Sequence, residues 1–342
     1  MLGNQKELKP FKITMLGPSG VGKTTLLTVI RKQMNSAVDV SELRLETGHP
    51  QKPGTGFETD QLLQKCLEEL EQLVKSKGYI AQGGIGGTGE PKKFYFNLSK
   101  LKKNVSSAKL VLEFQDYPGG WIAQEENAKQ VIDYIKDSSV TILVIDTPAL
   151  LERKGKHHVA VNQSEIVQQM LLRAFSEDGS NKRRLLIFAP VKCEKYLRKG
   201  NQYRELEKGI RSGYKSLIES LNSEIFNNIS AVITPVQTVG NVLFSYIDEI
   251  EENGKIVTKF WYEKTNNHEL APFDAEQPLR YILGFALKDA LDAKRNERLD
   301  LVNWFRDMLG LDEDLKMAIQ KFGEGCKKDG GFTVIKGGHL LG

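Results

Sequence analysis

Short apolar runs recur along the chain and alternate with longer stretches of helical periodicity. Six of these runs have the length and composition of β-strands: Phe11–Leu16, Lys93–Leu98, Lys109–Gln115, Val140–Asp146, Leu185–Pro190 and Ala231–Thr234. Several lack the polar alternation of a half-exposed strand, which indicates burial on both faces. The pattern predicts an α/β fold of three layers, in which helices cover both faces of a mostly parallel central sheet.

Apolar positions spaced three and four residues apart predict helices between the strands. The predicted helices are Lys23–Gln33, Thr59–Ser76, Asn162–Phe175, Tyr203–Ile225, Pro278–Ala293 and Arg298–Met308. Val242–Tyr262 instead predicts a β-hairpin that turns at Asn253-Gly254. The final segment, Gly330–Gly342, contains two Gly-Gly pairs, and we expect it to be a loose tail.

The length of 342 residues allows two domains or one large domain with insertions. We expect one main domain at 8–293 and a helical C-terminal extension at 294–342. Three long insertions interrupt the predicted main domain, at about 34–92, 147–183 and 241–270. Loops of this length in a compact domain usually serve a function.

Composition excludes some classes of protein. With 40% hydrophobic residues the chain can form a core, and no apolar run approaches the roughly 18–20 residues that span a bilayer. The first residues lack the apolar segment of a secretory signal. Because Cys66, Cys193 and Cys326 lie far apart, we expect a cytoplasmic protein without a zinc site. The net charge of +4 gives no clear signal for nucleic acid or membrane binding.

The strongest chemical signal is Gly17-Pro-Ser-Gly-Val-Gly-Lys-Thr24, which matches the Walker A pattern between a predicted strand and a predicted helix. Its glycines permit the backbone N–H groups to surround phosphate oxygens. We expect Lys23 to contact the β- and γ-phosphates during catalysis and the Thr24 hydroxyl to bind Mg²⁺. The expected phosphate-binding set is Gly17, Ser19, Gly20, Val21, Gly22, Lys23, Thr24 and Thr25. The motif alone does not choose among nucleotide-binding proteins, because it also suits a guanylate-kinase-like enzyme.

A second motif, Asp116-Tyr-Pro-Gly119, ends the predicted strand Lys109–Gln115. An aspartate at this place can hold Mg²⁺ through a water molecule. The glycine three residues later can offer its N–H to the γ-phosphate, as in a nucleotide-dependent switch. The alternative is an ordinary β-turn.

Two weaker motifs follow later strands. In Val191-Lys192-Cys193-Glu194, the carboxylate can accept hydrogen bonds from guanine N1–H and N2–H₂ while the lysine stem packs on the base. The alternative is a solvated ion pair at the start of a helix. After the last predicted strand, a backbone N–H near Gln237 can meet guanine O6. These motifs favour guanine over adenine.

With these motifs in order, the sequence resembles the TRAFAC-class, Ras-like P-loop GTPases. It is most similar to the large inserted kind found in bacterial operons, including conflict and defence systems. The resemblance implies a P-loop fold over about residues 8–293, GTP and GDP as ligands, Mg²⁺ as cofactor and hydrolysis of GTP to GDP and phosphate. It also implies a switch that acts on a protein effector or activating partner, with self-association as one possibility.

Two positions depart from the family pattern. The guanine motif of the family is Asn-Lys-x-Asp, whereas this chain has Val191 and Glu194 at its ends. A glutamine that orients water usually follows the glycine of Asp-x-x-Gly, and here that position is Gly120. We therefore expect slow intrinsic hydrolysis, with water positioned from elsewhere. The candidates for positioning the water are Gln124, Glu125, Glu126 and a partner. Arg153 is a candidate arginine finger, the alternative being an exposed basic loop that is only solvated.

Thr88 precedes the second predicted strand and suits a threonine that orders around the γ-phosphate and Mg²⁺. The alternative is a flexible glycine-rich linker. Three functions remain open from the sequence: a GTP-hydrolysing switch, a nucleotide-kinase-like phosphotransferase or other ATP-binding P-loop protein, and a nucleotide-binding scaffold that hardly hydrolyses.

Overall fold

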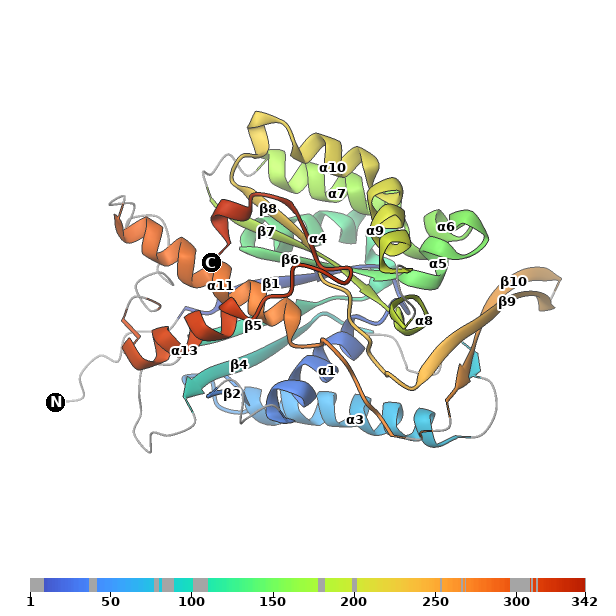
Figure 1. Cartoon of the computed structure of the whole chain (residues 1–342), viewed down its shortest axis with the longest axis horizontal. Helices are drawn as coiled ribbons and strands as arrows, with labels where there is room; N and C mark the ends of the chain where they lie inside the picture. Colours follow the sequence, from blue (N-terminus) through green and yellow to red (C-terminus); the bar gives the residue numbers. More distant parts are fainter. Residues whose placement is uncertain are drawn as a thin grey trace.

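The computed structural model describes residues 9–36, 42–76, 80–81, 89–100, 110–177, 182–198, 202–252, 254–265, 267, 269–295, 308, 310–311 and 313–341. Its centre is an eight-stranded sheet with the order β11-β8-β7-β6-β1-β5-β4-β2 (Figure 1). The strands are β1 Phe11–Leu16, β2 Leu43–Thr47, β4 Lys92–Lys100, β5 Leu110–Asp116, β6 Val140–Asp146, β7 Arg184–Val191, β8 Ile229–Ile233 and β11 Thr333–Lys336. All six strands predicted from the sequence are therefore confirmed.

The sheet is mostly parallel. Strand β1 pairs in parallel with β5 on one side and β6 on the other, and β7 and β8 continue the parallel series. Strand β4 runs antiparallel to β5 and β2, and β11 runs antiparallel to β8. In the register of β1 and β5, Met15 lies opposite Asp116. The carboxyl ends of the two strands therefore meet at one edge of the sheet.

Helices cover both faces of the sheet (Figure 1), so the fold is α/β and compatible with the predicted three layers. One core contains Ile13 and Met15 of β1 and lies under α1 Lys23–Ser36, α3 Thr55–Lys75, α11 Gln277–Arg295 and α13 Glu313–Glu324. The other core contains Leu16. Its helices are α4 Glu125–Asp137, α5 Thr147–Leu151, α6 His158–Asn162, α7 Ser164–Glu177, α8 Glu194–Leu197, α9 Gln202–Gly213 and α10 Lys215–Leu221. No helix in the described ranges is long and apolar enough to cross a membrane.

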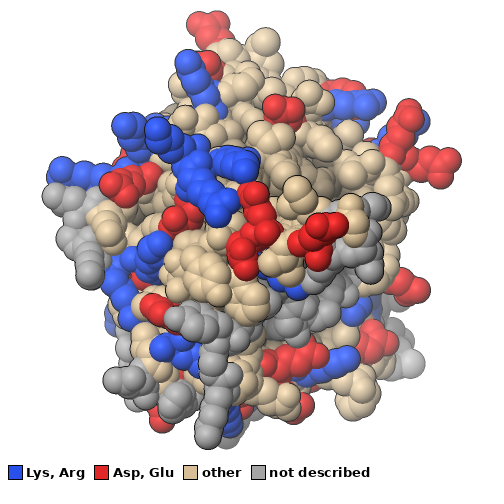
Figure 2. All heavy atoms as spheres, turned by 90° about the vertical axis from the view of Figure 1, so that its right-hand side faces the viewer, with Lys and Arg blue, Asp and Glu red and all other residues tan. Residues whose placement is uncertain are grey.

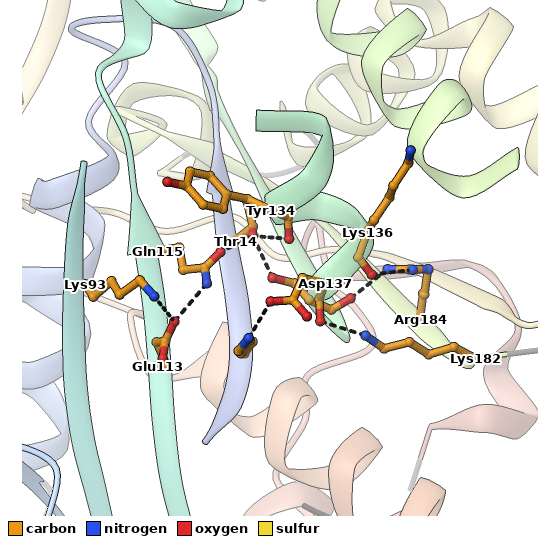
Figure 3. Close-up of polar contacts among 11 residues, drawn as sticks. Thr14, Lys93, Glu113, Gln115, Tyr134, Lys136, Asp137, Lys182 and Arg184 are labelled. Atoms are coloured by element: carbon orange, nitrogen blue, oxygen red, sulfur yellow. Dashed lines mark hydrogen bonds and ion pairs between the residues drawn. The ribbon is translucent and has the colours of Figure 1, made fainter. Parts of the chain in front are cut away.

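A buried polar network ties the sheet to α4 (Figure 3). The hydroxyl of Thr14 donates to the backbone oxygen of Tyr134 at 3.0 Å, across the face of β1. On the next strand, the Gln115 amide donates to the Glu113 carboxylate at 2.8 Å. At the same C-terminal end of α4, Arg184 donates to the backbone oxygens of Ile135, Lys136 and Ser138. These bonds satisfy C-terminal carbonyls of α4 and fix the helix beside β1.

The hairpin predicted at Val242–Tyr262 is confirmed. It consists of β9 Val242–Glu252 and β10 Lys255–Lys264, which pair antiparallel and extend from one end of the molecule (Figure 1). The short strand β3 Ile80–Ala81 adds to β10. Gly254 has a φ of 74°, which suits the tight turn predicted there.

One predicted helix is divided in the structure, and another cannot be compared with it. The single helix predicted over 203–225 is wrong: α9 ends at Gly213 and α10 begins at Lys215. At the break, the His158 Nε2 atom lies 3.3 Å from the Gly213 oxygen, and a Cβ at Gly213 would lie 2.7 Å from the same Nε2 atom, so this position requires glycine. Most of the predicted helix Arg298–Met308 lies outside the described residues.

The predicted loose tail is also wrong. Within Gly330–Gly342, strand β11 pairs with the open edge of β8, and the short 3₁₀-helix η4 Gly338–Leu340 follows. Phe332 is only 3% exposed. The two Gly-Gly pairs suggested a free end, but the pairing of β11 with β8 and the burial of Phe332 stabilise an ordered one.

Candidate functional site

The predicted phosphate-binding loop connects β1 to α1 at the carboxyl edge of the sheet. Gly20 and Gly22 have φ values of 78° and 111°, which residues with a side chain rarely adopt. Val21 points into the core and is fully buried, whereas Ser19 is exposed. Thr25, on the first turn of α1, lies beside the thiol of Cys66 on α3. The loop therefore has the conformation that the glycine pattern predicts.

Lys23 is folded onto this loop. Its ammonium group donates to the backbone oxygen of Gly17 at 2.9 Å and lies 3.8 Å from the Asp116 Oδ1 atom. It also lies 5.3 Å from the centre of the Tyr117 ring. Burial lowers the pKa of Lys23, and the Asp116 carboxylate opposes that effect. A buried cation with a single carboxylate neighbour is suited to bind further negative charge.

Thr24 and Asp116 come together from neighbouring elements. The Thr24 hydroxyl at the start of α1 donates to the Asp116 Oδ2 atom at the end of β5, at 2.7 Å. Asp116 is 1% exposed. A hydroxyl and a carboxylate are oxygen ligands of the kind that Mg²⁺ prefers, with waters and phosphate oxygens completing its octahedron. The pair therefore fits the predicted magnesium site. No group of three or more His, Cys, Asp and Glu side chains suited to a metal ion occurs among the described residues.

Gly119 lies against the phosphate-binding loop. A Cβ atom at this position would lie 2.0 Å from the backbone nitrogen of Ser19, so only glycine permits the approach. Gly119 begins the 3₁₀-helix η1 Gly119–Ala123. Tyr117, which the sequence analysis gave no role, is fully buried, and its hydroxyl accepts a hydrogen bond from the backbone N–H of Gly17. The Asp-x-x-Gly segment and the loop are thus in direct contact.

Lys192 connects the third motif to the same loop. Its ammonium group donates to the backbone oxygen of Gly20 at 3.1 Å and to the Asp146 Oδ2 atom at 2.6 Å. Asp146 ends β6, is fully buried and caps α5 by accepting the N–H of Ala149. Sequence reasoning missed this role of Asp146, although an aspartate before Thr-Pro is a typical helix start.

Glu194 and Gln237 are engaged within the protein. The Glu194 Oε1 atom accepts the backbone N–H groups of Val239 at 2.9 Å and Gly240 at 3.3 Å. The backbone N–H of Gln237 donates to the oxygen of Phe273 at 3.1 Å. Glu194 is 2% exposed, and burial raises its pKa, against the effect of the backbone N–H donors. Both groups predicted to contact guanine thus make internal bonds.

The residues considered for water positioning do not converge on the loop. Arg153 donates to Glu249 and to the backbone oxygen of Ile247 on the hairpin, both at 2.9 Å. Glu249 also pairs with Lys156, in a region where Figure 2 shows basic and acidic side chains side by side. Gln124, Glu125 and Glu126 are exposed at the start of α4. Thr88 lies outside the described residues.

In comparisons with known proteins, no family model and no curated protein matches this chain. The assignment of function therefore rests on the geometry of Lys23, Thr24, Asp116, Gly119 and Lys192.

Proposed function

We propose that the protein binds GTP with Mg²⁺ at the loop 17–24 and hydrolyses it slowly to GDP and phosphate, as a switch for a protein partner. One observation carries the proposal: the Thr24 hydroxyl lies 2.7 Å from the Asp116 carboxylate, beside the glycine-rich loop and the buried Lys23. The strand of Asp116 lies directly beside β1, as the resemblance to the TRAFAC-class GTPases requires.

The residues of this chain have distinct parts in the proposed reaction. Lys23 exchanges its bond to Gly17 for contacts with the β- and γ-phosphates and neutralises their charge. The Thr24 hydroxyl and the Asp116 carboxylate would hold Mg²⁺, Asp116 through a water molecule. The ion would polarise the phosphate oxygens and hold the phosphates in line for attack. The N–H of Gly119 contacts the γ-phosphate, so its position depends on whether that phosphate is present.

A less selective nucleotide hydrolase is the second candidate. The internal bonds of Glu194 and Gln237 favour it, because these two groups were expected to distinguish guanine from adenine. GTP remains the first choice because the order of the motifs resembles that of the TRAFAC-class GTPases. Lys192 lies between the loop and Asp146, where its stem can pack on either base.

Slow hydrolysis follows from the surroundings of Gly119. Gly120 has no side chain, and Arg153 is bound to the hairpin. An arginine finger can contribute roughly 10³–10⁵-fold to such a reaction. A partner, or a second copy of the chain, would therefore raise the rate of hydrolysis. It would do so by supplying a side chain that orients the water, or by releasing Arg153 from the hairpin.

Phosphate release under single-turnover conditions tests this proposal. We expect release from GTP to be faster than from ATP, slow at high dilution, and faster at high protein concentration or with a partner encoded nearby. An Asp116→Asn variant should lose the activity, whereas Asp133→Asn, on the exposed face of α4, should keep it. Equal activity of the Asp116→Asn variant would contradict the proposed magnesium site.

A further inference from the structure

The hydroxyl of Tyr262 is a buried polar group without a hydrogen bond. Tyr262 lies on β10 at the base of the hairpin and is 8% exposed. Its hydroxyl has no hydrogen-bond partner within the part of the chain that the structure describes. An unpaired buried hydroxyl costs about 1–3 kcal/mol, so a protein seldom retains one without a use.

A β-bulge sets the direction of this side chain. Trp261 lies opposite Tyr246, but Tyr262 lies opposite Phe244, so Ser245 is an extra residue on β9. Residues three positions apart on a regular strand point to opposite faces. Because of the extra residue, Phe244 and Ile247 are both buried on the same face of the hairpin. Bulges often occur beside functional sites, where they redirect a side chain.

Contacts connect Tyr262 to the helix that begins with Glu194. The rings of Tyr262 and Phe244 meet edge to face, with centroids 5.9 Å apart. The ammonium group of Lys195, the second residue of α8, lies 4.7 Å from the centre of the Phe244 ring. Burial raises the pKa of Tyr262, and the nearby carboxyls of Asp146 and Glu194 raise it further. The hydroxyl therefore stays protonated and lies close to both carboxyls.

The proposed guanine site lacks one donor. Guanine presents the acceptor O6 next to the donors N1–H and N2–H₂, and Glu194 can serve only the donors. The backbone N–H of Gln237, expected to meet O6, donates to Phe273 instead. The Tyr262 hydroxyl is a donor near enough to Glu194 for the carboxylate charge to act on it.

We propose that the Tyr262 hydroxyl binds the base, by donating a hydrogen bond to guanine O6. This inference rests on the proposed function, since it assigns a specificity residue to the same nucleotide site. Adenine has an amino group where guanine has O6, and its N1 is an acceptor where guanine N1–H is a donor. The hydroxyl as donor and the Glu194 carboxylate as acceptor therefore together match guanine and not adenine. Because the hydroxyl is buried, the base reaches it only when the hairpin shifts at Phe244 and Tyr262. Nucleotide binding is then coupled to the position of the hairpin.

Affinities of GTP and ATP for a Tyr262→Phe variant test the inference, because this change removes only the hydroxyl. We expect GTP to bind about five- to tenfold more weakly and ATP to change less than twofold. The melting temperature should stay the same or rise, since an unpaired buried hydroxyl is removed. A purely structural role of the hydroxyl predicts a lower melting temperature instead. Tyr246→Phe, on the other face of the hairpin and 45% exposed, is the matched control and should leave both affinities unchanged.

The outcomes separate this inference from the proposed function. If the wild-type chain binds GTP, and Lys23→Ala abolishes binding while Tyr262→Phe does not weaken it, only the role of Tyr262 is wrong. Equal losses for GTP and ATP, or ATP binding as tight as GTP in the wild type, also overturn that role. If the wild-type chain binds neither nucleotide, both proposals fail.

Discussion

Single residues in the site are held by bonds that a ligand would have to replace. Lys23 donates to the oxygen of Gly17, Thr24 donates to Asp116, and Glu194 accepts two backbone N–H groups. Each bond satisfies a buried polar group. A phosphate oxygen would replace the Gly17 oxygen as acceptor for Lys23, Mg²⁺ would take the place between Thr24 and Asp116, and the N–H groups of guanine would replace the backbone donors to Glu194. Binding of the proposed ligand at this site would thus be an exchange of contacts rather than the filling of a rigid pocket.

The stability of the protein should depend on pH through Glu194. Burial raises the pKa of Glu194 in the folded chain above its ordinary value of 4.5. The folded state then retains this proton at pH values where the unfolded chain has lost it, so the contribution to stability falls as pH rises above 4.5. A Glu194→Gln variant has no carboxyl proton to release, so its stability does not show this decrease with rising pH. Urea denaturation at pH 5 and pH 8 should show the variant gaining stability relative to the wild type at the higher pH, and the opposite trend would contradict the expectation.

At the scale of elements, the sequence predicts best where one periodicity dominates. The six buried strands and the hairpin at Asn253-Gly254 follow directly from apolar runs and a turn signal. The edge strands β2 and β11 were not predicted, because edge strands are short, more polar and defined by the neighbour they pair with. The break between α9 and α10 lies at a contact with His158, which no local pattern contains.

The contact between the Asp-x-x-Gly segment and the phosphate-binding loop makes Gly119 sensitive to substitution. In Gly119→Ala the new methyl group would lie 2.0 Å from the Ser19 nitrogen, so the two segments must separate. We expect a loss of about 1–3 kcal/mol in the free energy of unfolding, measured by urea denaturation. Gly120→Ala is the matched control, because its methyl group would meet no atom within 4 Å and should change stability by less than about 0.5 kcal/mol. Equal stability of the two variants would contradict the contact.

At the scale of the whole molecule, the C-terminal segment completes the fold. It contributes β11 to the sheet, and α13 packs on the same core as α1 and α11. Lys327 pairs with Asp274 at 2.6 Å, one residue beyond the Phe273 whose oxygen accepts the N–H of Gln237. The segment therefore supports the turn beside the proposed base site, although its two Gly-Gly pairs suggested a free end.

Replacing Lys327 tests this connection. Lys327→Ala leaves the Asp274 side chain, which is 9% exposed, without its cation. We expect a loss of about 1–2 kcal/mol, moderated by the partial exposure of Lys327, and a melting temperature lower by about 1–3 °C. Lys328→Ala removes an exposed neighbouring charge and should leave the melting temperature unchanged. Similar melting temperatures for both variants would show that the ion pair does not support the turn.

The phosphate end of the site could be predicted from the sequence, whereas the base end could not. Lys23, Thr24 and Asp116 belong to local motifs whose spacing fixes their geometry. Tyr262 and Asp146 come from separate parts of the chain. The packing of the hairpin against α8 brings Tyr262 near Glu194, and the pairing of β6 with β7 brings Asp146 beside Lys192. When residues far apart in the sequence meet only through tertiary packing, no local sequence motif indicates their contact.

Equilibrium binding of a fluorescent GTP analogue in the presence of Mg²⁺ tests the central claim most directly. The account predicts that the wild-type chain binds it, that excess ATP competes less well than GTP, and that removal of Mg²⁺ weakens binding. Lys23→Ala should lower the affinity at least tenfold, whereas Lys32→Ala, on the same helix and bound to Glu71 at 3.7 Å, should not. Binding that is unchanged within twofold in Lys23→Ala, or absent in the wild type, would contradict the account.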